Sequence, residues 1–184
     1  MDRDLLARAY DRSAATYDDQ FRSQQREKYR AAARLLASAA PPPGPILDAG
    51  GGTALFAEWL GDAGEPSAPV REQLRGRTLV VLDASLEMLR RAAPRAPVRV
   101  FGDLERPPFG QRFALVVAFT SLLGDAAAGA RALGGVLAPG GLLAVTMLAG
   151  EAPRAEQLAR AAALRHLAGP VRAGRDRAFL LRRG

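Results

Sequence analysis

The segment from Ile46 to Phe56 constrains the fold of this chain more than any other. A short apolar run ends in Asp48, the glycines Gly50 to Gly52 follow, and a helical pattern of apolar residues then begins. Glycine lets the backbone turn sharply and lets a ligand approach the main chain closely, and the start of the next helix favours a negatively charged group. Strand, glycine loop and helix in this order are typical of nucleotide sites in open α/β sheets. A tight turn that holds no ligand is the alternative interpretation.

Apolar strands and helices alternate through the rest of the sequence. Runs such as Leu79 to Leu82 are continuously apolar, as in parallel sheets that are covered on both faces. We therefore expect an α/β fold, a doubly wound, Rossmann-like, mostly parallel sheet with helices on both faces. The expected strands are 46–49, 78–82, 98–101, 113–119, 142–148 and 178–182, the last pairing with a weak strand near Val171, and the expected helices are 54–61, 85–93, 126–137 and 153–167.

Residues 1–40 are interpreted as a helical cap on this sheet. The helical pattern runs from Leu5 to Ala39, and the proline-rich stretch Pro41 to Pro45 ends it. This cap is too short to bury a core of its own, so residues 1–184 are predicted to form a single domain with its Rossmann-like core at 45–184. Residues 61–76, rich in proline and charge, are expected to form a surface loop.

The glycine-rich segment resembles the first motif of class I S-adenosylmethionine-dependent methyltransferases, acid-x-Gly-x-Gly-x-Gly. Asp48, Gly50 and Gly52 occupy its first three defined positions, and Ala54 stands where the family usually has a third glycine. The resemblance implies that Asp48, Gly50 and Gly52 bind S-adenosylmethionine as cofactor. The extra methyl group of Ala54 is expected to tighten the site slightly.

Two further acids follow the next two expected strands. Asp83 ends the second strand, where a carboxylate accepts hydrogen bonds from both ribose hydroxyls of a nucleoside. In the family the acid at this place holds the ribose, which implies that role for Asp83, with Ala84 beside it. A Gly-Asp pair after the third strand binds adenine in the family, which implies that role for Asp103 and for the backbone N–H of Leu104. Considered alone, each acid has a helix cap or a turn as its alternative role.

Three more segments extend the resemblance. The expected fourth strand matches that of the family, with Ala114 in place of the common acid, and its end from Phe119 to Ser121 is expected beside the transferring methyl group. Leu137 to Gly141 matches the turn Leu-x-Pro-Gly-Gly before the fifth strand. The segment from Tyr10 to Asp18 resembles the N-terminus of methyltransferases of menaquinone and ubiquinone biosynthesis, which implies that Tyr17 helps to close the cofactor site. Packing of the tyrosines between cap and sheet is the alternative.

Composition excludes several kinds of site. The chain has no cysteine, which excludes disulfides, thiolate metal sites and cysteine nucleophiles, and its single histidine, His166, excludes a histidine-based metal cluster. No apolar run approaches the ~20 residues of a membrane span. No signal-like leader opens the chain, so we expect a cytoplasmic protein with no membrane partner.

The positive net charge of +7 is uneven along the chain, with many arginines between Glu151 and Gly184. Such a patch attracts phosphate or anionic substrates. The segment holds one aromatic residue, Phe179, so base stacking has little support. A solvated basic surface is the simpler interpretation, and nucleic-acid binding is the alternative.

These matches lead to the hypothesis of an S-adenosylmethionine-dependent methyltransferase that transfers a methyl group to a small-molecule acceptor by in-line displacement. Such a reaction depends on proximity, alignment and exclusion of water, so no catalytic residue is assigned. Two alternatives stay open: an RNA methyltransferase that uses the arginine-rich C-terminal segment, and a non-catalytic cofactor-binding module. The acceptor site is expected to be open or completed by a second subunit, as in a dimer. For an acceptor that needs a base, the nearest candidates are Tyr17, Thr120, Ser121 and Asp125.

Overall fold

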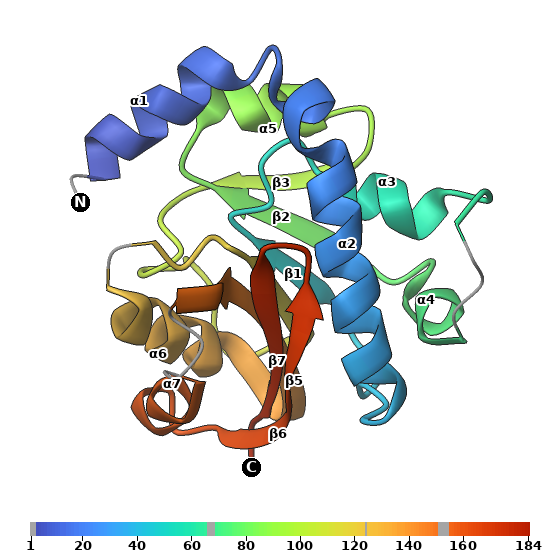
Figure 1. The fold of residues 1–184 in the computed structure, drawn as a ribbon. Helices are drawn as coiled ribbons and strands as arrows, with labels where there is room; N and C mark the ends of the chain where they lie inside the picture. The colour runs from blue at the N-terminus through green and yellow to red at the C-terminus, as the bar shows by residue number, and fades with distance from the viewer. Residues whose placement is uncertain (1–2, 66–68, 124, 151–154) are drawn as a thin grey trace.

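A seven-stranded sheet forms the centre of the molecule (Figure 1), in a computed structural model that describes residues 3–65, 69–123, 125–150 and 155–184. Within these residues the strand order is β3-β2-β1-β4-β5-β7-β6. The strands from β3 to β5 in that order run parallel, and β7 runs antiparallel to both β5 and β6. The predicted α/β fold with a mostly parallel, Rossmann-like sheet is confirmed. The strands are β1 (Ile46–Ala49), β2 (Leu79–Asp83), β3 (Val98–Phe101), β4 (Phe113–Phe119), β5 (Leu137–Leu148), β6 (Arg165–Ala173) and β7 (Asp176–Arg182).

Helices cover both faces of the sheet (Figure 1). Alternate residues of β4 meet the two layers: Leu115 and Val117 pack with one, Val116 and Ala118 with the other. The whole of β4 is buried, which explains its continuously apolar sequence. None of the described helices has the length and apolar character that a membrane span needs. One face carries α2 (Tyr17–Ala37), α3 (Leu55–Gly61), α4 (Pro69–Leu74) and α5 (Leu86–Ala92), the other carries α6 (Ala126–Val136) and α7 (Ala155–Ala161), and α1 (Arg3–Ser13) packs against α5.

The direction in which the chain adds strands reverses beside β1. From β1 the chain proceeds to β2 and β3 on one side, and then returns to β4 and β5 on the other. At such a switch point the loops after neighbouring strands diverge and leave a crevice at the carboxyl ends of the strands. Apart from Tyr17 in α2, the residues that the sequence predicts to bind a cofactor lie near the ends of β1, β2 and β4 or in the loops after β1, β2 and β3.

The N-terminal helical stretch is divided in two, whereas the sequence suggested one continuous pattern. α1 ends at Ser13 and α2 begins at Tyr17, after a turn in which the Thr16 N–H donates to the Ser13 carbonyl at 3.0 Å. Ala14 in this turn is buried. Because of the break, α2 lies along the sheet while α1 crosses to α5 (Figure 1).

The expected loop 61–76 contains a helix, α4, among its described residues. Val70 and Leu74 lie one helical turn apart and are both buried against the core. Pro69 is the first described residue of the helix, and proline is tolerated in the first turn of a helix. The two buried apolar residues outweigh the proline-rich and charged composition that suggested a loop.

The expected helix 153–167 ends earlier than predicted, and its predicted start lies outside the described residues. α7 ends at Ala161, and Arg165–Ala173 forms β6. β6 pairs with β7 in a register that includes Val171 opposite Ala178, as the sequence predicted for this end of the chain. Pairing with β7 therefore overrides the helical pattern of the preceding residues.

Candidate functional site

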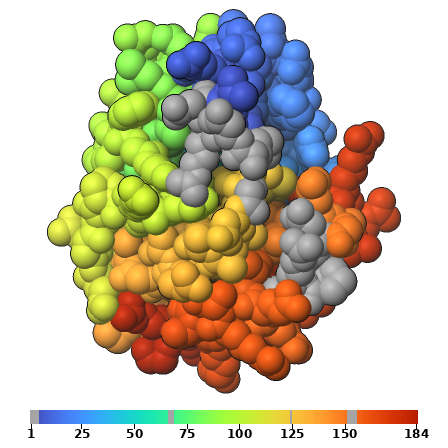
Figure 2. Space-filling model, turned by 90° about the vertical axis from the view of Figure 1, so that its left-hand side faces the viewer, coloured from blue at the N-terminus to red at the C-terminus, as the bar shows by residue number. Residues whose placement is uncertain are grey.

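A cavity of about 750 Å³ lies at the carboxyl ends of β1, β2, β3 and β4. Loops after these strands and residues of α1 and α2 form its mostly apolar wall, and its volume is that of a small-molecule site. In Figure 2 the blue residues of α1 lie beside the green residues of α5, above the yellow residues that lead into α6. The structure brings to this cavity all the predicted cofactor residues except Asp48, namely Tyr17, Gly50, Gly52, Asp83, Ala84, Asp103, Leu104 and Phe119.

The glycine loop after β1 has a backbone that side chains disfavour. Gly50 and Gly52 have φ values of 70° and 55°, in the left-handed region that glycine adopts at little cost. A Cβ atom on Gly50 would lie 2.4 Å from the Cβ of Ser121. Ala54 also has a positive φ of 62°, but it is fully buried against Val81 and its neighbours. The methyl group of Ala54 therefore lies in the core, not in the cavity wall that it was expected to tighten.

Asp83 joins the glycine loop to the end of β2. Its Oδ2 accepts a hydrogen bond from the Gly52 N–H at 2.8 Å, and its Oδ1 accepts one from the Ser85 N–H at 2.8 Å. Burial raises the pKa of Asp83, and these N–H groups act against that rise. Backbone N–H groups of Gly52, Ala84 and Ser85 use three of the roughly four acceptor positions of this carboxylate, so a ligand hydroxyl in the cavity can still bind.

Asp103 and Leu104 follow β3 and line the same cavity. The Asp103 Oδ1 accepts a hydrogen bond from the Glu105 N–H at 2.8 Å. The Gly102 N–H donates to the Asp83 carbonyl at 3.0 Å, which fixes this loop beside β2. The acids of two successive loops thus border one space.

Asp48 lies behind the glycine loop, outside the wall of the main cavity. It is 2% exposed and borders a separate void of about 10 Å³ together with Tyr17, Gln25 and Gly51, which is space for roughly one water molecule. Burial, and secondarily the charge of Asp83, raises the pKa of Asp48 to about 8. The structure does not bring this predicted residue to the cavity with the others.

The two aromatic residues of the predicted site lie where the cap meets the sheet. The Tyr17 hydroxyl accepts a hydrogen bond from Gln25 Nε2 at 3.0 Å, and burial raises the pKa of Tyr17 to about 12. Phe119, at the end of β4, packs edge-on against Tyr29 at 4.7 Å between ring centroids. Both Tyr17 and Phe119 also line the cavity.

Two acids from the N-terminal segment attach the cap to the loops of the site. Asp11 Oδ1 accepts from the Ser85 hydroxyl at 2.5 Å and from the Glu87 N–H at 3.2 Å, while Ser85 itself caps α5. Asp18 accepts a hydrogen bond from the Thr53 hydroxyl at 2.5 Å, next to the glycine loop. The sequence placed these acids in a family-like segment but assigned them no role.

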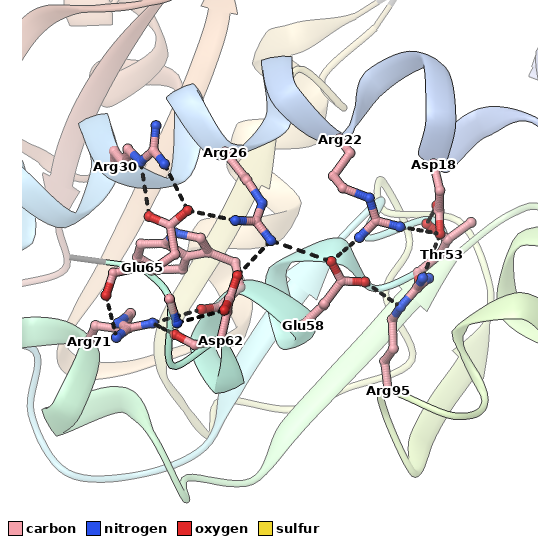
Figure 3. A network of polar contacts seen from close by, with 12 residues as sticks. Asp18, Arg22, Arg26, Arg30, Thr53, Glu58, Asp62, Glu65, Arg71 and Arg95 are labelled. Atoms are coloured by element: carbon pink, nitrogen blue, oxygen red, sulfur yellow. Dashed lines mark hydrogen bonds and ion pairs between the residues drawn. The ribbon is translucent and has the colours of Figure 1, made fainter. Parts of the chain in front are cut away.

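A network of ion pairs holds α2 against α3 and the residues that follow it (Figure 3). Arg26 and Arg30 of α2 both contact Glu65, whose side chain is 1% exposed, at 2.8 to 2.9 Å. Arg22 pairs with Glu58, which also binds Arg95 at 2.9 Å. The network fixes the helix that carries Tyr17 over the site.

None of the four candidate bases named from the sequence is placed and free to accept a proton from a ligand in the cavity. The Thr120 hydroxyl donates to Asp176 Oδ2 at 2.5 Å, and the Ser121 hydroxyl donates to the Ala49 carbonyl at 2.6 Å. Asp125 lies outside the cavity wall and accepts from the Ala128 N–H as the N-cap of α6. Tyr17 is a phenol of raised pKa.

A buried lysine that the sequence did not single out as a site residue also lines the cavity. Lys28 lies 3.0 Å from Asp176 Oδ2 and donates to the Thr120 hydroxyl at 2.8 Å. It is the only lysine of the chain. The presence of a single lysine among so many arginines is the one feature of the sequence that could have drawn attention to Lys28.

Several arginines of the C-terminal segment are bound to the protein itself. Arg182 donates to the Ala39 carbonyl at 2.6 Å, and Arg183 donates to the carbonyls of Gly134 and Leu137 at 3.0 and 2.9 Å. These guanidinium groups tie the end of β7 to the rest of the fold. None of the described arginines lines the cavity.

Solved structures share this fold. No protein-family model and no curated protein matches the sequence. A possible histamine N-methyltransferase from Thermotoga maritima, described as S-adenosylmethionine-dependent, aligns over 95% of this chain and 98% of its own at 16% identity, with a TM-score of 0.64. The amino pentose methyltransferase CalS10 from Micromonospora echinaspora aligns over 92% and 95% at 19% identity, with a TM-score of 0.67.

A third match is the magnesium protoporphyrin IX methyltransferase from Synechocystis, solved with S-adenosylmethionine bound. It aligns over 91% of this chain and 82% of its own at 16% identity, with a TM-score of 0.63. At such identities the likeness concerns the fold. The chain has the fold seen in structures of S-adenosylmethionine-dependent methyltransferases.

Proposed function

We propose that this protein is an S-adenosylmethionine-dependent methyltransferase that acts on a small-molecule acceptor. The observation that carries the proposal is the convergence of Gly50, Asp83 and Asp103, from three separate chain segments, on one cavity at the switch point of the sheet. We further propose that residues 1–184 act as a single domain, in which residues 1–40 close the site over the bound cofactor.

The chemistry of the cavity wall fits this cofactor. Gly50 and Gly52 line the cavity, and neither carries a side chain that would keep a ligand away from the main chain there. Asp83 would accept the ribose hydroxyls, and Asp103 with the Leu104 N–H would hold the edge of adenine. The mostly apolar wall suits the remaining body of the nucleoside. The cofactor supplies a methyl group that is already activated on a positively charged sulfur.

The protein would contribute alignment and exclusion of water. Tyr17 and Phe119 would cover the reacting region, and the contacts of Asp11 and Asp18 would keep the cap closed over it. The resemblance of the N-terminus to the menaquinone and ubiquinone methyltransferases supports this role of the cap. Transfer inside such a closed site needs only that the two reacting atoms be held in line.

A small acceptor is favoured over RNA. Arg182 and Arg183 of the C-terminal segment donate to backbone carbonyls of the protein, which removes part of the basic surface that RNA binding would use. Residues of α1 and α2 also form part of the wall of the cavity that a polynucleotide would have to enter.

Calorimetric titration with S-adenosylhomocysteine, the demethylated product, tests the proposal. We expect saturable binding with one ligand per chain, which thymidine added as a control nucleoside does not reproduce. Absence of binding by both S-adenosylmethionine and S-adenosylhomocysteine would contradict the proposed function.

A further inference from the structure

One cationic side chain lines the half of the cavity that faces away from Asp83 and Asp103. Among the described residues that line the cavity, Lys28 is the only cation. Its side chain is 5% exposed. A buried ammonium group interacts more strongly with a ligand than one in water, because the surroundings screen its charge less.

Lys28 belongs to a group of four polar side chains, Lys28, Thr120, Thr146 and Asp176, which we name the Lys28 cluster. Its ammonium group contacts Asp176 Oδ2 at 3.0 Å and Thr120 Oγ1 at 2.8 Å. The hydroxyls of Thr120 and Thr146 lie 3.0 Å apart. An ammonium group has three N–H donors, and these contacts use two of them. The described residues offer no partner for the third, which can therefore bind a ligand in the cavity.

Two features distinguish the Lys28 cluster from a purely structural ion pair. Asp176 is fully buried, yet its Oδ1 has no hydrogen-bond partner among the described residues. Buried ion pairs are stable when their remaining polar atoms are satisfied. Thr120 has a φ of 57°, a left-handed conformation that costs a residue with a side chain about 1 kcal/mol or more. Backbone strain of this kind occurs at functional sites, and Thr120 lines the cavity. The unpaired Oδ1 of Asp176 is an acceptor outside the cavity wall and has no part in binding an anion.

The described residues around this half of the cavity offer no group ready to remove a proton. The hydroxyls of Thr120 and Ser121 are used as donors to Asp176 and to the Ala49 carbonyl. The raised pKa of Tyr17 keeps that hydroxyl protonated at neutral pH. A nucleophile that arrives without a proton avoids the need for a base.

We propose that Lys28 binds an oxyanion of the methyl acceptor, a carboxylate or an acidic phenol carried on an apolar body. This inference rests on the proposed function. The apolar body would contact Phe21, Leu123 and Leu148, which line the same half of the cavity. The acceptor oxygen would form its bond to the methyl carbon as the carbon–sulfur bond breaks and its electron pair goes to sulfur. The negative charge on oxygen and the positive charge on sulfur both disappear, and no proton has to leave.

Charge at the site is consistent with such an acceptor. Lys28 and Asp176 together carry no net charge. Lys28 therefore offers an anion a hydrogen-bond donor in a fixed direction, while the pair exerts little long-range attraction on other anions. A monoanionic acceptor would then be balanced by the positive sulfur of the bound cofactor. A cationic acceptor would place two positive charges beside Lys28 in a site of low polarity, which is unfavourable.

The test measures binding to the full chain saturated with S-adenosylhomocysteine, by calorimetry. The probes are three compounds with the same ring and different charge. They are the anion of 2-naphthaleneacetic acid, its neutral amide, and the cationic amine 2-(2-naphthyl)ethylamine. We expect the carboxylate to bind at least about tenfold more tightly than the amide, and the amine more weakly than either. Equal binding of carboxylate and amide, a preference for the amine, or no binding of the carboxylate would overturn the inference.

A charge-neutral double variant tests the role of Lys28 without leaving a lone buried carboxylate. In Lys28→Met/Asp176→Asn the preference for carboxylate over amide should fall below about twofold, with the affinity for S-adenosylhomocysteine within about threefold of wild type. Arg34→Met, an exposed position on the same helix, should keep the full preference. A preference that persists in the double variant would overturn the assignment to Lys28. A large loss of S-adenosylhomocysteine affinity would instead show that Lys28 binds the cofactor, which also overturns it.

The same experiment separates this inference from the proposed function. If S-adenosylhomocysteine does not bind the wild-type chain, the proposed function fails. If it binds and the probes show no carboxylate preference, only the assignment of Lys28 fails.

Discussion

Asp83 stabilises two parts of the structure. Its carboxylate accepts hydrogen bonds from backbone N–H groups of the glycine loop and of the start of α5. In the proposed complex it also accepts the ribose hydroxyls. We predict that Asp83→Ala weakens binding of S-adenosylhomocysteine by about 2 kcal/mol, roughly 30-fold, through loss of charge-assisted hydrogen bonds. Titration calorimetry measures the change. Asp125→Ala, which removes a carboxylate that caps α6 outside the cavity, is the control, and equal affinities in the two variants would refute the ribose assignment.

Asp48 gives a pH-dependent prediction. Its pKa is raised from 3.8 to about 8 in the folded protein, so the folded state holds the proton more tightly than the unfolded chain does. Its contribution to the free energy of unfolding is complete below about pH 4 and is lost as the pH rises to about 8, by ~1.4 kcal/mol per pH unit. Asp48→Asn removes this dependence, so the variant should gain stability relative to wild type between about pH 5 and about pH 7.5. Urea unfolding of wild type and variant at about pH 5 and about pH 7.5 checks this. If the free energies of unfolding of the two proteins change equally between these pH values, Asp48 is ionised in the folded state.

Individual elements differ in how far the sequence determines them. β1, β2 and β4 were predictable because a strand buried on both faces needs a continuous apolar run, and Ser85 caps α5 as expected through its side chain. α4 was missed because a helix of six residues leaves only two buried apolar positions to detect. The boundary between α7 and β6 was missed because it depends on pairing with β7, which lies later in the chain.

The contact of α2 with the residues after α3 depends on Glu65 (Figure 3). Because this nearly buried carboxylate binds both Arg26 and Arg30, we predict that Glu65→Gln lowers the free energy of unfolding by about 1–3 kcal/mol. The matched change Glu72→Gln, at an exposed pair with Arg75, should cost less than about 1 kcal/mol. Urea denaturation of both variants gives the comparison. Similar losses in the two would mean that the network adds nothing beyond ordinary surface ion pairs.

For the molecule as a whole, topology decides which residues meet. The glycine loop and the acids after β2 and β3 were predictable as one site, because parallel strands end at the same edge of a sheet. The Lys28 cluster was not predictable, because Lys28, Thr120 and Asp176 lie far apart in the sequence and come together only when α2 packs across β4 and β7. Asp48 lies near the end of β1 as expected, but it borders the small separate void and not the main cavity.

We predict that ligand binding in the cavity slows amide hydrogen exchange in the cap, because the cap is attached to the loops of the sheet. Asp11 joins α1 to α5 beside the site, so binding of S-adenosylhomocysteine should slow amide hydrogen exchange in α1 by at least about threefold. In Asp11→Ala this protection should be lost, while Asp19→Ala, at an exposed position on α2, should keep it. Hydrogen exchange followed by mass spectrometry resolves the segment. Unchanged exchange in wild-type α1 would show that the cap does not close over the ligand.

A crystal structure of the protein with S-adenosylhomocysteine tests the central claim most directly. We predict that the ribose hydroxyls bind Asp83, that adenine lies beside Asp103 and Leu104, and that the main chain at Gly50 contacts the amino acid part of the ligand. A ligand found outside this cavity, or inside it without contact to Asp83, would contradict the account.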